Sequence, residues 1–493
     1  MVANERERHE CIIEEVRQAL KMAQDVPSTL KFSKMSHMMH SRRGFSKVGT
    51  RLPLLKRVVD FDDQGSAVWV EPDVTMEELV KATLHRGMIP AVVPEFKNIT
   101  VGGAIVGTAL ESSSFAHGQF NDICEEYELL CDDGTLLRCT PRQHSDIFYG
   151  VVGSFGSLGR VTLAKVRLFP AKKYVRLQYH VVESVSEAVE TLQQQCLAQP
   201  TSEFLEAMVI SDDRVVVMSG RQTDEEHLVS GVQMVGLTAP WAPWFCQHVL
   251  QQAERQNAVD LIPLVDYLFR YDRAAFWMGQ FTTSFHALWR YLLECCLSSP
   301  TLPRVFKNIF QQHGTSLQPN VFFRSLLAWK LSSKSLYRML RKLPEDTFAK
   351  IFLVQDYYIP TAQVSTFYQF LKDNVHIYPL WLCPLRGTTA LQILSPHFLK
   401  KKSQFPKPDF INVGVYGVPK DGKDVKEVTR ELEILTDQLG GRKMLYGTNY
   451  YSENSFWKIY DRNIYQQLRR SCHVNDDHSP LYERIQSSKN YSP

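Results

Sequence analysis

Short apolar stretches separated by polar turns occupy the first part of the chain, and their spacing predicts strands alternating with a few helices. Strands are predicted at VVDFD, AVWVEP, YELLCD, TLLRCT and VTLAKVRLF. A helix is predicted over residues 75–86, with Thr75 as N-cap and Glu77 and Glu78 in its first turn. A further helix over residues 7–24 places four apolar side chains on one face: Ile12, Ile13, Val16 and Leu20.

The pattern changes after Pro170. A strand at VRLQYHVV and a helix over residues 185–197 are followed by a long helical and aromatic region that ends near residue 345. The stretch from QIL to INVGVYGVP predicts further strands, and the last helices are expected between about residues 455 and 470. Helices and strands mixed in this order predict an α+β fold.

Length and charge narrow the class of protein. A chain of 493 residues is too long for one ordinary core, so we expect two domains. The charges of the 56 basic and 53 acidic side chains nearly cancel, so the chain lacks the large positive charge with which proteins attract nucleic acid. The ten cysteines lack paired C-x-x-C spacing and are expected to be reduced and mostly buried, so no zinc site is predicted.

The amino terminus, MVANERERHECIIEEVRQAL, is charged and has no apolar core of the kind found in secretory signals. No window approaches ~18 uninterrupted apolar residues. We therefore expect an intracellular protein without a spanning helix. Segments such as PWAPWFCQHVL and NVFFRSLLAWKLSSKSLYRMLRKL combine apolar and basic residues, which permits peripheral membrane contact but is more typical of an amphipathic core helix with a solvated basic face.

The stretch TVGGAIVGTALESSS carries the strongest chemical signal. Gly102, Gly103 and Gly107 have no Cβ, so the backbone there can approach a phosphate-bearing cofactor closely. The spacing is neither the G-x-G-x-x-G fingerprint nor a phosphate-binding P-loop. Two interpretations remain open from the residues alone: a nucleotide-binding loop, or glycines that pack at a tight crossing of the backbone.

A wider run of sequence favours the first interpretation. The runs WVEPDVTMEELV, VVPEFKNITVGGAIVGTALESSSFAHGQFNDICEEYELLCDDGTLLRCT and SDIFYGVVGSFGSLGRVTLAKVRLFPAKKYV resemble the FAD-binding domain of vanillyl-alcohol-oxidase-type flavoproteins. Within that superfamily the chain is similar to the delta24-sterol reductases. The likeness continues through PWFCQHV, IPLVDYLFRYDRAAFW, LVQDYYIP, VHIYPLWLCPL and MLYGTNYYSENSFWKIYDRNIYQQLRR, and so covers roughly four-fifths of the chain in the right order.

The resemblance implies a domain layout. Residues 1–172 are expected to form a PCMH-type FAD-binding domain with two subdomains. Residues 173–493 are expected to form an α+β substrate or cap domain whose carboxyl-terminal segment returns toward the flavin. Eukaryotic members carry an amino-terminal membrane anchor before the flavin domain, whereas here that domain is expected to begin almost at once.

Three segments are implied as flavin contacts. The first, FSKMSHMMHSRRG, contains Ser36 and Ser41 but no glycine before Gly44, so its phosphate contacts would come from hydroxyls and backbone amides, with Arg42 as a further candidate. The third, VGSFGSLGRV, contributes Gly153, Gly156, Gly159 and Val161. The second supplies Thr100, Val101, Gly102, Gly103, Ala104, Ile105, Val106, Gly107, Thr108, Ala109, Leu110, Glu111, Ser112 and Ser113.

The mode of flavin attachment follows from the same comparison. Many relatives bind flavin covalently through a histidine just before a serine, as in His40–Ser41, but the sterol reductases do not. Noncovalent FAD is therefore expected. His37, His40 and His117 have no spacing that would place them on one helix face, so no metal site is predicted. Arg160 and Glu71 are weaker candidates for flavin contacts.

The implied chemistry is reduction of the side-chain double bond of a sterol, with NADPH as electron donor. An unactivated alkene requires a protein acid beside the flavin, because no carbonyl group absorbs the developing charge. A dry channel could be lined by aromatic residues between Trp241 and Trp381, although such residues are as often simply core. The candidates for the acid are Glu111, His117, His376, Tyr378, Tyr450 and Tyr460.

Two alternatives remain from the sequence. A flavin-linked oxidase or dehydrogenase acting on another lipid or alcohol would keep the same FAD-binding domain. A flavin-free binding protein would keep the fold and explain the altered first segment. A sterol-like small molecule is the expected partner under the main hypothesis, and the oligomeric state is left open.

Overall fold

The computed structural model describes residues 4–24, 54–198, 201–225, 232–255, 258–282, 332–340, 347–401, 408–420, 423–476 and 478–486. The chain divides into two compact units. Unit 1 comprises Met1–Ala171, Gly387–Gln404 and Met444–Pro493, and unit 2 comprises Lys172–Arg386 and Phe405–Lys443. The assignment of a flavin domain to residues 1–172 and a substrate domain to 173–493 stays a prediction about function.

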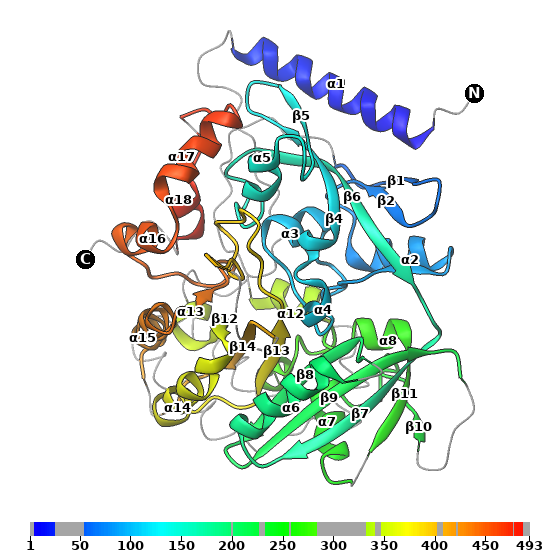
Figure 1. Ribbon diagram of the computed structural model, residues 1–493, viewed down its shortest axis with the longest axis vertical. Coiled ribbons are helices and arrows are strands. Elements are labelled where there is room, and N and C mark those ends of the chain that lie inside the picture. The colour runs from blue at the N-terminus through cyan, green and yellow to red at the C-terminus, as the bar shows by residue number, and fades with distance from the viewer. Residues whose placement is uncertain are drawn as a thin grey trace, which may run out of the picture. The chain divides into compact units, whose positions relative to one another are not determined.

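Unit 1 is built on a six-stranded antiparallel sheet (Figure 1). Its strand order is β1-β2-β6-β4-β5, and β3 pairs with one end of β6. The long strand β6 is central because its alternating apolar residues are buried between two neighbours. The strands are β1 (Val58–Phe61), β2 (Ala67–Val70), β3 (Met88–Pro90), β4 (Cys124–Leu130), β5 (Leu136–Cys139) and β6 (Arg160–Pro170).

Short helices and turns fill the connections of unit 1. The predicted N-cap of α2 is confirmed, and it forms part of a capping box: Thr75 accepts the Glu78 N–H, and Glu78 accepts the Thr75 N–H. The helices are α1 (Glu5–Gln24), α2 (Met76–Leu84), α3 (Val101–Val106), α4 (Ser114–His117), the 3-10 helix η1 (Phe120–Ile123), α5 (Ser145–Gly150), α16 (Glu453–Ile459), α17 (Arg462–Ser471) and α18 (Leu481–Ile485).

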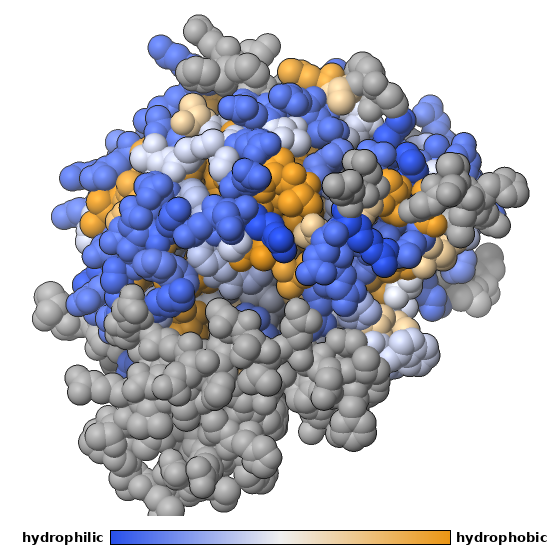
Figure 2. Space-filling view, turned by 90° about the horizontal axis from the view of Figure 1, so that it is seen from below, coloured by the Kyte–Doolittle hydropathy of each residue, from blue (hydrophilic) through white to orange (hydrophobic). Residues whose placement is uncertain are grey.

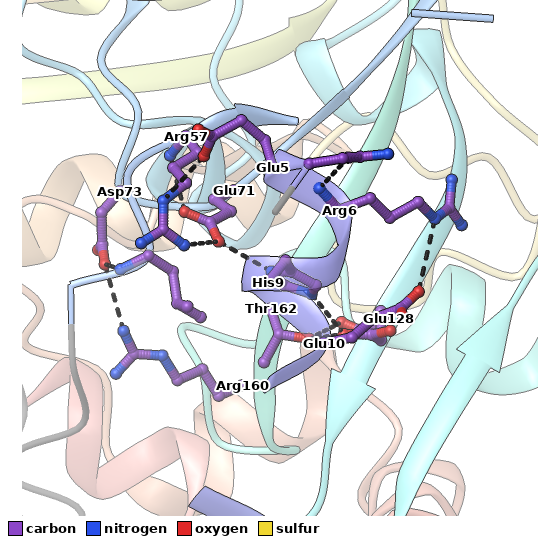
Figure 3. A network of polar contacts seen from close by, with 12 residues as sticks. Glu5, Arg6, His9, Glu10, Arg57, Glu71, Asp73, Glu128, Arg160 and Thr162 are labelled. Atoms are coloured by element: carbon purple, nitrogen blue, oxygen red, sulfur yellow. Dashed lines mark hydrogen bonds and ion pairs between the residues drawn. The ribbon is translucent and has the colours of Figure 1, made fainter. Parts of the chain in front are cut away.

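Helix α1 is held to the sheet of unit 1 by apolar packing and by one buried imidazole. Val16 and Leu20 pack against Leu130 of β4. Two turns nearer the amino terminus than Val16, His9 lies between two carboxylates, with Nδ1 2.8 Å from Glu71 and Nε2 3.0 Å from Glu128 (Figure 3). The amphipathic helix predicted over residues 7–24 is therefore confirmed, and its polar residue His9 is as buried as its apolar ones.

Unit 2 is built on a nine-stranded sheet that is antiparallel except for the pair β10–β11. The strand order is β10-β11-β7-β9-β8-β13-β14-β12-β15. The predicted strand at INVGVYGVP is confirmed as β14, whereas QIL forms no strand. The strands are β7 (Tyr174–Val182), β8 (Phe204–Ser211), β9 (Arg214–Thr223), β10 (Val232–Met234), β11 (Val259–Pro263), β12 (Leu353–Pro360), β13 (Leu380–Leu385), β14 (Phe410–Gly417) and β15 (Arg442–Lys443).

Helices pack on this second sheet. Helix α6 begins after Ser184, which caps it by accepting the Glu187 N–H, and it packs on β8 and β9. Helix α14 packs against α6, and α15 packs on β12. The helices are α6 (Val185–Leu197), α7 (Phe245–Gln252), α8 (Leu264–Leu268), η2 (Met278–Thr282), α12 (Ser333–Leu340), α13 (Thr347–Ile351), η4 (Thr361–Gln363), α14 (Val364–Asn374) and α15 (Val425–Gln438).

A buried ion pair lies in the core of unit 2. Arg270 Nε donates to Glu206 Oε1 at 2.8 Å, and both side chains are fully buried. The other oxygen of Glu206 accepts from the Trp381 indole at 2.7 Å and the Tyr271 hydroxyl at 3.1 Å. Because both carboxylate oxygens are hydrogen-bonded, the charge of Glu206 is compensated where water cannot reach it.

The surface carries few large apolar side chains. Hydrophilic residues cover most of the described surface on the face drawn in Figure 2, with apolar residues between them. Trp241 of unit 2 and Leu391 of unit 1 are among the more exposed, at 64% and 62%. Among the described residues, no helix combines the length and apolar character needed to cross a bilayer. Peripheral membrane contact stays a prediction.

The position of His9 predicts that the stability of unit 1 depends on pH. Burial alone would lower the pKa of its imidazole, but the hydrogen bonds and charges of Glu128 and Glu71 outweigh burial and raise the pKa to about 9. The resulting stabilisation, about 3 kcal/mol at most, is fully present below the unfolded pKa of about 6.5 and is lost as the pH rises through about 9.

Denaturant unfolding at about pH 6 and about pH 10 tests this prediction. The His9→Gln variant should be less stable than the natural protein at the lower pH and should approach it at the higher pH. The exposed His85 supplies a matched control, since His85→Gln should leave the difference between the two pH values unchanged. A constant deficit of His9→Gln across this range would contradict the assignment of a buried charged imidazole.

Candidate cofactor site

The first expected flavin segment, residues 32–44, lies outside the described residues, and with it Ser36, Ser41, His37 and His40. The second and third segments are both described and both belong to unit 1. The site is therefore built here from residues 100–113 and 152–161.

The second segment begins with helix α3. Thr100 is the N-cap and accepts the N–H of Gly103 at 3.2 Å. The helix starts against the backbone of residues 72–74: the Gly102 N–H donates to the Pro72 carbonyl at 2.9 Å. A Cβ at Gly102 would lie 2.7 Å from Pro72 Cβ, so only glycine fits here. At this position the structure supports the packing interpretation of the glycine.

A sharp turn ends α3. Gly107 is the C-cap, and Thr108 follows with φ +60°, a left-handed conformation that is unusual for a β-branched residue. The Thr108 hydroxyl donates to the Gly107 carbonyl at 2.7 Å, and the Ala109 N–H donates to the Ala104 carbonyl at 3.0 Å. These bonds hold a strained backbone, and strain of this kind gathers at ligand-binding sites.

Glu111 has a local role in the chain that leaves this turn. Its side chain is buried and accepts from the Ser112 hydroxyl at 2.6 Å and from the Ser113 N–H at 3.0 Å. The Ser113 hydroxyl donates in turn to the Ala91 carbonyl at 2.5 Å. These contacts fold residues 111–114 into a compact turn ahead of α4.

The third segment is a loop with several left-handed residues. Gly153, Phe155, Gly156 and Gly159 have φ of +75°, +51°, +71° and +128°. A Cβ at Gly153 would lie 2.5 Å from the carbonyl oxygen of Leu394, so that position requires glycine for space as well as for φ. Phe155 is the exception, because it adopts the same conformation with a bulky side chain.

The second and third segments lie side by side. The Phe155 N–H donates to the carbonyl of Val106, the last residue of α3, at 3.2 Å. A second connection runs through residues 72–74. Asp73 accepts from Arg160 Nη2, at the end of the third segment, at 3.3 Å, and from the Leu55 N–H at 3.0 Å (Figure 3). Arg160 and Glu71 are the two weaker candidates for flavin contacts. Arg160 is paired with Asp73, and Glu71 is paired with His9 and Arg57.

One buried polar atom in this region lacks a partner. Ser157 is fully buried, and within the described part of the chain its hydroxyl has no hydrogen-bond partner. Next to it, a Cβ at Gly156 would make only ordinary contacts, with Arg484 at 3.7 Å and the Gly159 carbonyl at 3.8 Å. A strained loop and an unpaired buried hydroxyl fit a polar cofactor such as FAD.

A polar cluster beside the second segment was missed by the sequence analysis. Asp122 of η1 accepts from His397 Nε2 and from Gln392, each at 2.8 Å. His397 Nδ1 lies 2.6 Å from the Ser395 hydroxyl, which donates to Gln119 at 2.8 Å. Burial alone would raise the pKa of Asp122, but the His397 charge and the hydrogen bonds outweigh burial and lower it.

The side chains of this cluster hold residues 387–401 to the core of unit 1. Ser395, His397 and Asp122 occur in the order of a nucleophile relay. Ser395 and His397 are fully buried, however, and the Ser395 hydroxyl already donates to Gln119. The arrangement is therefore one of structural hydrogen bonds.

The six candidate acids are divided between the units. Glu111, His117, Tyr450 and Tyr460 belong to unit 1, and His376 and Tyr378 belong to unit 2. His117 is half-buried at the end of α4, with its ring 4.9 Å from that of Phe169. Tyr450 is half-buried, whereas Tyr460 is fully buried with its ring 4.6 Å from Phe456.

The two candidates in unit 2 have different surroundings. Tyr378 donates a short hydrogen bond to Asp212 and lies 3.2 Å from the Tyr368 hydroxyl. Burial and these hydrogen bonds raise the pKa of Tyr378 well above its ordinary value. His376 is half-buried in a left-handed conformation, with its N–H donated to the Leu371 carbonyl at 2.9 Å.

The aromatic residues proposed as a substrate channel are mostly core. Trp244, Phe245 and Trp277 are each 1% exposed, and the Trp277 indole donates to the Tyr416 carbonyl at 2.8 Å. Phe322, Phe323 and Trp329 lie outside the described residues. A channel within unit 2 therefore stays a prediction. In the described ranges, no three His, Cys, Asp or Glu side chains gather as a metal site would require.

Comparison with known proteins agrees with this geometry. Residues 13–140 match the FAD binding domain family. The chain is 30% identical to a Delta(24)-sterol reductase of Homo sapiens over 437 residues, which cover 87% of this chain and 76% of the relative. This chain belongs to the delta24-sterol reductase family. It is also 27% identical to a Delta(24)-sterol reductase homolog of Caenorhabditis elegans (91% and 83% covered) and 26% identical to the Delta(24)-sterol reductase of Arabidopsis thaliana (84% and 72% covered).

Gly102 tests how the second segment is positioned. In the Gly102→Ala variant the new methyl group would press against Pro72, so the variant should lose about 1–3 kcal/mol of stability and bind FAD more weakly. Thermal unfolding and a flavin titration measure both effects. Gly236→Ala is the control, since a Cβ at Gly236 would meet only Asp266, at 3.9 Å. If Gly102→Ala and Gly236→Ala had the same stability and the same FAD affinity, the close approach of Gly102 to Pro72 would be contradicted.

Proposed function

We propose that this protein is an FAD-dependent oxidoreductase that reduces the side-chain double bond of a delta24 sterol, with NADPH as hydride donor. Family membership and the match to an FAD binding domain support this proposal. The structural observation that supports it is the hydrogen bond from the Phe155 N–H to the Val106 carbonyl, because it joins the second segment to the glycine-rich loop that carries the buried, unpaired hydroxyl of Ser157.

Residues on both segments would hold the cofactor. The backbone of residues 100–113 and the glycines at 153, 156 and 159 would approach it closely, and Ser157 would donate or accept one hydrogen bond. Ser36 and Ser41 of the first segment remain proposed phosphate contacts. No histidine attachment is part of the proposal, so the flavin is expected to be released when the protein is denatured.

The chemistry of an isolated alkene determines what the protein itself must supply. Hydride transfer from NADPH to one alkene carbon is the chemistry that bound FAD would supply. A protein group must deliver a proton to the other carbon, and the site must keep water away while it does so.

Among the candidates we propose His117 as the proton donor, because of its position. It lies at the end of α4, directly after the second segment, and it is half-buried. An imidazole can deliver a proton near neutral pH. Glu111 instead accepts structural hydrogen bonds, and Tyr378 donates its proton to Asp212.

Anaerobic reduction of the purified protein tests the proposed function. We expect bound flavin that absorbs near ~450 nm, loss of that absorbance on addition of NADPH, and its return when a delta24 sterol is added, with the saturated sterol as product. Flavin that NADPH leaves oxidised would exclude this donor. Reoxidation by oxygen but not by the sterol would indicate an oxidase, and the absence of any flavin binding would indicate a binding protein that keeps the fold.

The role of His117 has its own test. His117→Gln should slow sterol reduction by about 10²-fold or more, while NADPH still reduces the flavin at the natural rate. Stopped-flow absorbance separates the two half-reactions. His85→Gln, which changes an exposed histidine on unit 1, is the control and should match the natural protein in both. If the sterol half-reaction of His117→Gln keeps its natural rate, the proton comes from another group.

A further inference from the structure

The loop of residues 153–159 is held from one side by three residues near the carboxyl terminus, Arg469, His478 and Arg484, which we call the carboxyl-terminal segment. Three consecutive peptide carbonyls of the loop are each contacted by a basic side chain. Arg484 Nη1 donates to the Phe155 carbonyl at 3.2 Å, and Arg469 Nη1 donates to the Ser157 carbonyl at 3.3 Å. Between them, His478 Nε2 lies 3.0 Å from the Gly156 carbonyl. Consecutive partners of this kind fix the orientation of the peptide planes.

The three basic side chains also hold one another in place. Arg484 Nη2 lies 2.6 Å from His478 Nε2, and Arg484 Nε donates to the Ser479 carbonyl at 2.8 Å. Arg469 Nη2 donates to the His478 carbonyl at 2.9 Å. On the other side of its ring, His478 Nδ1 lies 3.0 Å from Asp132 of unit 1. The group is thus a connected network anchored on one carboxylate.

Arg484 remains a cation in this environment. Desolvation by burial lowers the pKa of its guanidinium to about 10, which is still well above neutral pH. Its hydrogen bonds to carbonyl oxygens are therefore charge-assisted, and such bonds are stronger than those between neutral groups.

The loop requires such support because its backbone is strained. Phe155 has φ +51°, a left-handed conformation that is unfavourable for a residue with a bulky side chain. The N–H of Phe155 is bound to Val106 of the second segment, and its carbonyl is bound to Arg484. The strained residue is therefore held by its two polar backbone groups, one facing the second segment and one facing the carboxyl-terminal segment.

We propose that Arg484, together with Arg469 and His478, positions the 153–159 loop to receive FAD. This inference rests on the proposed function. Bound to the two arginines, the carbonyls of Phe155 and Ser157 are oriented toward Arg484 and Arg469, and their partial negative charges are compensated by cationic donors. On the same loop, the buried Ser157 hydroxyl has no hydrogen-bond partner among the described residues.

Arg484→Gln and Arg469→Gln in the full-length protein test this positioning role. Arg470→Gln is the matched control, because Arg470 is exposed on the same helix as Arg469 and its replacement removes the same charge. Flavin fluorescence quenching gives the dissociation constant of FAD, and thermal unfolding with and without FAD gives the stabilisation that FAD confers.

We expect the FAD dissociation constant to rise about tenfold in Arg484→Gln and by a smaller factor in Arg469→Gln, and to stay within about twofold in Arg470→Gln. The unfolding temperature gained on adding FAD should shrink in the first two variants. Arg484→Lys should recover part of the affinity, since it keeps the charge but loses the forked geometry.

A purely structural role gives a different result. Arg484→Gln would then unfold at a lower temperature without FAD while its FAD affinity equalled that of the natural protein, and this result would overturn the inference. If Arg484→Gln does not fold, Arg469→Gln and Arg484→Lys decide the question by the same two measurements. If the natural protein binds no FAD at all, the proposed function fails, and the positioning role fails with it.

Discussion

The close approach of two backbone segments at Pro72 and Gly102 is the constraint on which the candidate site depends. Helix α3 can begin only where Gly102 lies against Pro72, since any side chain there would collide with the proline ring. From the same short stretch, Asp73 holds Leu55 and Arg160. The start of α3 and the end of the 153–159 loop are therefore fixed to one piece of chain, and that fixes their separation.

Buried polar groups supply the second constraint in unit 1. His9 between two carboxylates, Asp122 with His397, and the basic side chains around the 153–159 loop each connect segments that are far apart in the sequence. Removing one partner of a buried pair leaves the other charge uncompensated, which costs far more than the pair itself contributes. These networks specify where the amino-terminal helix, residues 387–401 and the carboxyl-terminal helices pack.

Local signals in the sequence predicted much of the fold. The N-cap of α2 is Thr75, as predicted, and helix α6 has the bounds predicted from its apolar period. The glycines near residue 102 were recognised as places of close approach. The sequence left open whether the approach is to protein or to a cofactor, and for Gly102 the neighbour is Pro72.

Other parts of the site could not be predicted because their partners are remote in the chain. His397 lies 275 residues from Asp122, and Arg469 lies 312 residues from Ser157. No local period or spacing relates residues at such distances. Glu111 illustrates a different limit. Its place in the predicted cofactor loop suggests an acid, but its carboxylate accepts hydrogen bonds from Ser112 and Ser113 and so stabilises a turn. Only the fold reveals which polar residues are already satisfied.

A crystal structure of the protein with FAD would test the central claim most directly. The account predicts that the flavin lies between residues 102–108 and 153–159, with the Ser157 hydroxyl within about 3 Å of one of its polar atoms. It also predicts that the carbonyls of residues 155–157 keep their bonds to Arg484, His478 and Arg469. Flavin bound away from these two segments, with Ser157 still unpaired, would contradict the account.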